Sequence, residues 1–156
     1  MSKIELSRNK VLKLTNAVVV EITEGLEENL ELIVMKIENY IRSKGYTPIG
    51  PLIQYTDTNI DENGVADIVV KLIRQSSGFI HHVELPYKCI STMRISNCMY
   101  VRYTGPESML RFAYDKIRIT AFEEDIKLIG DSYTIFVNQI DDNIVADVFM
   151  EKANNE

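Results

Sequence analysis

Apolar and polar residues follow two different rhythms along this chain, and these rhythms predict its secondary structure. Val11 to Thr23 is rich in β-branched residues and predicts a strand. From about Leu26 to Lys44, apolar residues recur every three or four positions, as on one face of a helix. Two short strands are predicted near Gly50–Asp57 and Val65–Arg74, and the polar segment 58–64 between them favours a hairpin. The first half of the chain is therefore predicted to be β-α-β-β.

The second half of the chain predicts the same order again. A strand is expected near Cys89–Thr104, and Gly105-Pro106 is expected to begin a helix, since proline is tolerated in a first turn. Strands follow near Lys127–Val137 and Ile144–Glu151. The helix carries a buried stripe made of Leu110, Ala113, Tyr114, Ile117 and Ala121. The predicted fold class is α+β, with antiparallel sheets and one long helix in each half.

The sequence repeats itself at a shift of 80 residues without gaps. Asp61–Asp67 returns as Asp141–Asp147 with five of seven residues identical, and the stretch from Gly25 to Lys71 matches its copy at 13 of 47 positions. Chance alone gives about three matches at typical residue frequencies. We therefore expect one domain over residues 1–156, built from two modules at about 1–76 and 83–152. Two such modules would form a ligand cleft on a pseudo-two-fold axis.

Composition and charge narrow the function classes. The chain has 156 residues, 46% of them apolar, and a net charge of −6 with a pI near 5.0. This charge disfavours direct nucleic-acid binding, and no DNA-binding domain is expected, because the two modules use nearly the whole chain. No apolar run reaches the ~18 residues of a membrane span. Cys89 and Cys98 form no disulfide framework, so a cytoplasmic protein is expected, and His81-His82 completes no metal site.

Two aspartates stand out in the last strand of each module. Alternation places one apolar set under the module's own helix, and this set comprises Ala66, Ile68, Val70, Leu72, Ala146, Val148 and Met150. The opposite face carries Asp67 in one copy, and Asp147 with Phe149 in the other, and is expected to line the cleft. The two carboxylates could hold a cationic or hydrogen-bonding ligand, or work as an acid/base pair. Alternatively, each ties down a backbone amide or a neighbouring Arg or Lys.

Aromatic residues accompany the aspartates on the strands expected to border the cleft. They are Tyr55, Tyr100, Tyr103, Tyr133, Phe136 and Phe149. Tyrosine faces can hold planar or cationic ligands. The alternative is ordinary core packing with the hydroxyl at the surface.

The stretch Tyr103–Ile117 resembles a known family. Its Gly105-Pro106, Leu110 and Ala113-Tyr114 match the Gly-Pro-x-x-x-Leu-x-x-Ala-Tyr signature of the GyrI-like small-molecule-binding domain, and Leu85-Pro86 and Ile129-Gly130 also fit it. This is the effector-binding domain of AraC-type and MerR-type multidrug regulators, and it also occurs alone. The resemblance implies an aromatic cleft between the two modules that takes bulky, often cationic or planar compounds.

The chain departs from this family at positions expected in the cleft. Thr134 stands where many members have a glutamate, and Phe136 stands at the following tyrosine position. Gln54 is the equivalent of Thr134 in the first module, and Glu107 replaces a tyrosine after Gly-Pro. The family's carboxylate near the last strand is matched by Asp147.

Three function classes remain open. The first is a binding module for small hydrophobic or aromatic compounds, acting as sensor or sequestering protein, with no cofactor, metal or assigned catalytic residue. The second is a hydrolase of reactive electrophiles that uses a cleft carboxylate, and the third is an inhibitor of a protein partner such as a topoisomerase. The predicted ligand-binding set is Tyr55, Asp67, Tyr103, Tyr133, Thr134, Phe136, Asp147 and Phe149.

Overall fold

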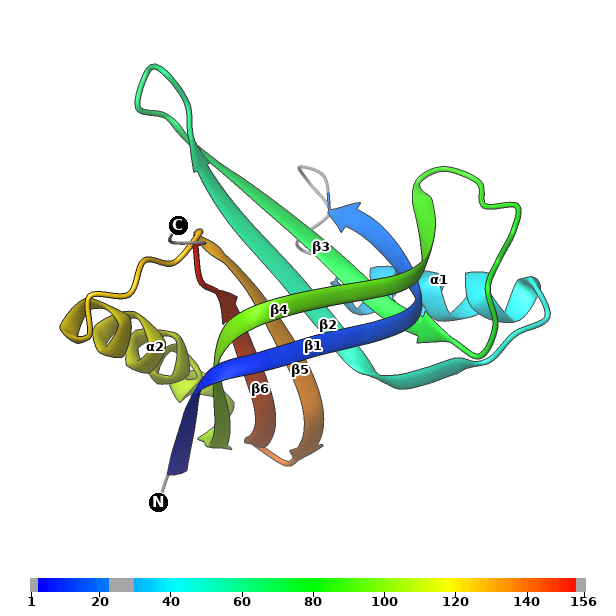
Figure 1. Cartoon of the computed structure of the whole chain (residues 1–156). Helices are drawn as coiled ribbons and strands as arrows, with labels where there is room; N and C mark the ends of the chain where they lie inside the picture. The colour runs from blue at the N-terminus through cyan, green and yellow to red at the C-terminus, as the bar shows by residue number, and fades with distance from the viewer. Residues whose placement is uncertain (1–2, 23–29, 154–156) are drawn as a thin grey trace.

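The computed structural model describes residues 3–22 and 30–153, in which six antiparallel strands close into a barrel with two helices on its outside (Figure 1). The elements in chain order are β1 (Lys3–Ile22), α1 (Leu30–Ser43), β2 (Pro48–Ile60), β3 (Ala66–Ser76), β4 (Tyr87–Pro106), the short 3₁₀ helix η2 (Glu107–Met109), α2 (Arg111–Glu123), β5 (Asp131–Ile140) and β6 (Asn143–Glu151). The predicted order of elements is therefore found in both halves. Within the described ranges, no helix is both long and apolar enough to span a membrane.

The strands follow the order β1-β3-β2-β5-β6-β4 around the barrel. Each half of the chain contributes three adjacent strands, and the halves meet at two joints. Among the described residues, the β1–β4 joint contains fourteen residue pairs, whereas the β2–β5 joint contains only five. One closed sheet thus replaces the separate sheets that the sequence predicted.

Several element boundaries differ from the prediction. The first strand begins at Lys3 and not near Val11, because residues 3–7 pair with β4. Gly105-Pro106 ends β4 and does not begin a helix; Pro106 is extended, with φ −61° and ψ 137°, and pairs with Asn143. The predicted start of the first helix, 26–29, lies outside the described residues.

Three hydrophobic clusters hold the fold together. The barrel interior contains Leu12, Leu14, Ala17, Val19, Ile53, Ile73, Ile95, Cys98, Tyr133 and Phe149. The cluster under α1 contains Val18, Val20, Ile22, Ile37, Ile41, Leu72 and Ile80. The cluster under α2 contains Met99, Val101, Tyr103, Ala113, Ile117, Ala121, Ile144, Ala146, Val148 and Met150. The stripe predicted for the second helix packs on this cluster, with Ala113, Ile117 and Ala121 buried and Leu110 and Tyr114 partly buried.

Two asparagines with positive φ allow each long strand to place side chains in two hydrophobic clusters. Asn16 (φ 50°) lies in β1, and Asn97 (φ 62°) lies in β4. Before Asn16, the even-numbered Leu12 and Leu14 face the barrel interior, but after it the odd-numbered Ala17 and Val19 do so. The same change occurs in β4 around Asn97. Each asparagine thus reverses the alternation of its strand. At Asn97 the register with β1 also shifts, as at a β-bulge, whereas the register with β4 is unchanged across Asn16.

The β2–β3 hairpin extends beyond the barrel as a two-stranded arm (Figure 1). In the described part of the chain, β2 pairs with β5 only as far as Asp57, and β3 pairs with β1 only as far as Val70. Ala66 and Ile68 therefore lie on the arm and are exposed, and the prediction that they lie under the first helix is wrong. Val70 and Leu72, farther along β3, do pack under α1.

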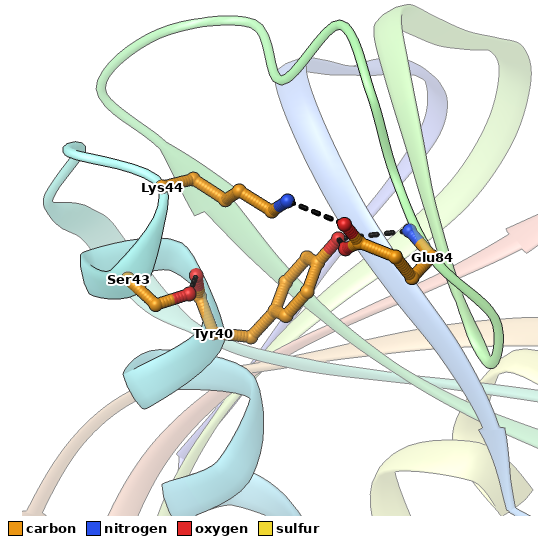
Figure 2. A network of polar contacts seen from close by, with 4 residues as sticks. All are labelled: Tyr40, Ser43, Lys44 and Glu84. Carbon is orange, nitrogen blue, oxygen red and sulfur yellow. Dashed lines mark hydrogen bonds and ion pairs between the residues drawn. The ribbon is translucent and has the colours of Figure 1, made fainter.

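The C-terminal end of α1 is fixed to the connector between the halves (Figure 2). The Tyr40 hydroxyl and the Lys44 ammonium both bind the Glu84 carboxylate, with Lys44 Nζ 2.7 Å from Oε1. Hydrogen bonds from Lys44 and Tyr40 lower the pKa of Glu84 to about 2. The Tyr40 ring also stacks on Tyr87, with centroids 4.2 Å apart. These contacts hold the helix so that its other end borders the groove described next.

Candidate functional site

A groove of about 580 Å³ lies outside the barrel, between the N-terminal end of α1 and the start of η2. Its floor is the face of the sheet formed by β3, β2, β5 and β6. The lining residues are Leu30, Glu31, Val34, Leu52, Gln54, Leu72, Glu107, Phe136, Asn138, Gln139 and Ile144. Residues from both halves of the chain therefore meet in this groove, which has the volume of a small-ligand site.

The groove combines apolar walls with acidic ends. Glu31 comes from the first turn of α1, and Glu107 begins η2, so that each carboxylate is supplied by a different half. The amide of Glu107 donates to the carbonyl of Asp142 at 2.9 Å, which fixes η2 against the β5–β6 turn. Among the described lining residues there is no lysine, arginine or histidine. This arrangement favours a ligand with an apolar body and a positive charge.

Two cross-strand neighbours lie at the centre of the groove floor. Gln54 and Thr134 are paired directly across the β2–β5 joint. Gln54 lines the groove, but Thr134 is only 2% exposed and its hydroxyl is hydrogen-bonded to the Tyr114 hydroxyl on α2. Phe136, two residues farther along β5, lines the groove. It is the one member of the predicted ligand-binding set that does so.

Three predicted aromatic residues lie inside the barrel. The rings of Tyr55 and Tyr133 are 4.8 Å apart, and Phe149 is 4.8 Å from Tyr100. Burial, together with the charge of Asp131, raises the pKa of Tyr55 to about 12. These contacts are those of the alternative interpretation, in which the strand tyrosines pack in a core.

Tyr103 lies on the opposite face of the sheet, beneath α2. It is fully buried, and its hydroxyl donates to the carbonyl of Pro106 at 2.6 Å. Because side chains alternate along β4, Tyr103 faces away from Tyr100. It therefore helps to position the Gly-Pro turn and η2.

The two aspartates occupy very different surroundings. Asp147 receives two hydrogen bonds from Arg102, at 2.8 and 2.9 Å, and one from the Tyr100 hydroxyl at 2.7 Å. The same contacts raise the pKa of Arg102. Asp67 is exposed on the arm, where it pairs with Asn59. Asp147 is thus tied to an arginine, as the alternative interpretation has it, and neither aspartate lines the groove.

The carboxylates of the groove were not among the predicted site residues. Glu107 did carry a signal, because it departs from the family tyrosine immediately after Gly-Pro. Glu31 carried none beyond its place in a helical first turn. Leu30 and Val34 belong to the apolar stripe that predicted the helix, and that stripe also forms one wall of the groove.

The comparisons with known proteins concern the fold. No family model matches the chain, and no curated protein matches it significantly. The structural match to a hydrolase from Listeria innocua covers 94% of this chain and 92% of that protein, with 10% sequence identity and a TM-score of 0.63. The match to the EcmrR C-terminal domain covers 99% of this chain and 98% of that domain, with 12% sequence identity and a TM-score of 0.62. The match to EcmrR in a complex with DNA covers 99% of this chain and 58% of the EcmrR chain, with 12% sequence identity and a TM-score of 0.63. At such identities the likeness establishes the fold alone, and that fold fits the GyrI-like domain that the sequence resembles.

Proposed function

We propose that this chain is a small-molecule-binding module of the GyrI-like type that captures hydrophobic or aromatic cations in the groove between α1 and η2. The observation that carries the proposal is the lining of the groove, in which Glu31 and Glu107 are the charged residues and the walls are apolar. Burial of an apolar ligand body supplies affinity at roughly 25 cal/mol per Å² of area, before the costs of association are subtracted. The carboxylates then select for positive charge.

The arrangement of the two halves supports a groove built on a pseudo-two-fold axis. In the β2–β5 joint, Ile53 pairs with Ile135, Gln54 with Thr134 and Tyr55 with Tyr133. If each residue is replaced by its equivalent 80 positions away in the other half, the same three pairs are obtained. Positive φ also recurs at that shift, at Gly45 and Asp125 and at Gly50 and Gly130. We propose that the axis passes between Gln54 and Thr134, at the floor of the groove.

A matched pair of ions tests the charge selection. Tetraphenylphosphonium and tetraphenylborate have similar size and shape but opposite charge, so binding of the cation alone would show that the groove selects charge. Glu107→Gln should weaken binding of the cation by about tenfold, or about 1.4 kcal/mol. Glu123→Gln, an exposed change on α2 outside the groove, serves as the control. Equal binding of both ions to both variants would contradict the proposal.

A biological role follows if the proposal holds. The module would act as a sensor or as a sequestering protein. With a net charge of −6, we expect no direct contact with nucleic acid. A sensor would therefore act on nucleic acid through a protein partner or through a domain outside these residues.

Hydrolysis is a second candidate, favoured by the structural likeness to a protein described as a hydrolase. In this chain Glu107 is the carboxylate best placed to activate water, because it borders the groove at a defined turn. The test is turnover of a reactive aromatic ester or epoxide. Loss of turnover in Glu107→Gln with retained binding of the uncharged substrate would favour an enzyme, and no turnover by the unmodified protein would exclude this candidate for those substrates.

A further inference from the structure

Three carboxylates gather at the end of the β2–β5 joint, away from the groove lining. Asp57 and Asp131 form the last residue pair of that joint. Glu151 at the end of β6 adds a third carboxylate, whose charge acts on Asp131. Neighbouring like charges disfavour full ionisation of all three carboxyl groups.

Asp131 is the buried member of this cluster. It is only 8% exposed, and its Oδ1 has no hydrogen-bond partner among the described residues. Its Oδ2 accepts a long hydrogen bond of 3.5 Å from the Tyr55 hydroxyl. An ionised carboxylate in such a place is costly, whereas a protonated carboxyl needs less solvation.

We propose that the carboxyls of Asp57, Asp131 and Glu151 form a proton-binding site that tightens the β2–β5 joint when it is protonated. The joint is sensitive to such a site because it contains five residue pairs, against fourteen in the β1–β4 joint. Deprotonation sets two opposed carboxylates at the end of this short ladder, and cross-strand like charges destabilise a sheet.

The electrostatics of the cluster agree with this geometry. Burial raises the pKa of Asp131 to about 6, and the charges of Glu151 and Asp57 add to the effect. The other titratable and charged groups around the cluster come from β2, β5, β4, β3 and the residue after β6. They are Tyr55, Tyr133, Cys98, Lys71, Arg94 and Lys152. The tyrosines and the thiol are neutral near pH 6, and hydrogen bonds from the backbone amides of Asp131 and Glu151 oppose, but do not cancel, the upward shift.

The proposed proton-binding site and the groove share two strands, β2 and β5. Gln54 on β2 and Phe136 on β5 line the groove, and both strands end at or near the cluster. Proton binding should therefore favour a well-formed groove floor. This consequence rests on the proposed function, whereas the proton site itself does not.

The test uses the full chain without any ligand. Carbon-detected NMR titration of the carboxyl groups should give Asp131 a midpoint near pH 6. Hydrogen exchange, corrected for intrinsic rates, should show amide protection in the β2–β5 joint falling about tenfold or more between about pH 5 and about pH 7.5. In Asp131→Asn the protection should no longer change with pH, while Asp115→Asn, an exposed control on α2, should behave as the unmodified protein does.

Two results would overturn the proposal. One is an Asp131 midpoint near 4, the ordinary value for an aspartate, which can be read from the unmodified protein even if Asp131→Asn fails to fold. The other is restoration of protection at about pH 7.5 by added Mg²⁺ or Ca²⁺, which would make the cluster a cation site. Neither result depends on whether the groove binds tetraphenylphosphonium, so the two proposals fail separately.

Discussion

Gln54 and Thr134 face each other across the β2–β5 joint, 80 residues apart in sequence and at equivalent points of the repeat. Because Thr134 is covered by Tyr114, only Gln54 of the two lines the groove. The centre of the floor therefore carries a polar but uncharged group, the Gln54 amide. The negative charge comes instead from the helix ends, through Glu31 and Glu107.

This relationship predicts that a single change can add charge to the floor. Gln54→Glu should strengthen tetraphenylphosphonium binding by about tenfold, or about 1.4 kcal/mol, because it places a third carboxylate under the ligand. Isothermal titration calorimetry measures the effect. Asn39→Asp adds the same charge on an exposed part of α1 and should leave affinity nearly unchanged. Similar effects from both variants would mean that net charge, and not the groove, controls binding.

The two aspartates of the repeat should differ sharply in their contribution to stability. Asp147→Ala removes the partner of Arg102 and Tyr100, so we expect a loss of about 1–3 kcal/mol in the free energy of unfolding, since Arg102 is itself about half exposed. Asp67→Ala, at the exposed equivalent position, should change it by less than about 0.5 kcal/mol. Urea denaturation of the two variants provides the comparison. Equal losses would show that Asp67 has a structural role that its exposure on the arm does not indicate.

The stability of the protein should fall as pH rises through the titration of Asp131. The folded state holds the proton of Asp131 more tightly than the unfolded state, since the pKa is raised to about 6 from 3.8. Its stabilising contribution is therefore complete below about pH 4 and is lost as pH rises past about 6. Asp131→Asn should accordingly be more stable than the unmodified protein at about pH 7.5, by about 1–3 kcal/mol.

Denaturation curves at several pH values measure that difference. It should shrink as pH falls and vanish below about pH 3, where the unmodified carboxyl is neutral in both states. A variant that is less stable at every pH would show that the ionised carboxylate is favourable in the folded protein.

The two thiols should react at different rates. Cys98 is fully buried, and burial with the charges of Glu151 and Asp131 raises its pKa to about 11, so very little thiolate is present near pH 8. In a Cys89→Ser variant, Ellman's reagent should modify Cys98 only as fast as the protein unfolds. A native-state reaction at the rate of a free thiol would show that the barrel interior opens readily at this point.

Local patterns in the sequence predicted much of the fold. The order of elements followed from apolar periodicity, and the stripe through Ala113, Ile117 and Ala121 followed from helical spacing. These features depend on neighbours within a few turns of chain, which a sequence displays directly. The sequence resemblance to the GyrI-like domain is also local, since it rests on a short turn and a helix. The fold of the structural neighbours fits this resemblance.

The faces of the strands could not be predicted in the same way. The alternation of side chains assigns a residue to a face only while it continues unbroken. The positive-φ residues Asn16 and Asn97 reverse it, and the residue types around them do not reveal the reversal. The exposure of Ile68 depended on where the neighbouring strands stop pairing, which is a property of the closed barrel. The groove itself depended on the meeting of Glu31 and Glu107 from distant parts of the chain.

The most direct test of the proposed function is thermal unfolding with tetraphenylphosphonium in a blocked groove. Val34 lines the groove from α1, so Val34→Trp should fill it, whereas Met35→Trp places the same ring at the exposed neighbouring position. At about 100 times its dissociation constant the ligand should stabilise the unmodified protein and Met35→Trp by about 2.7 kcal/mol, which corresponds to a rise of a few degrees in Tm. The account predicts that Val34→Trp loses this rise. An undiminished rise in Val34→Trp would show that the groove between α1 and η2 is not the binding site.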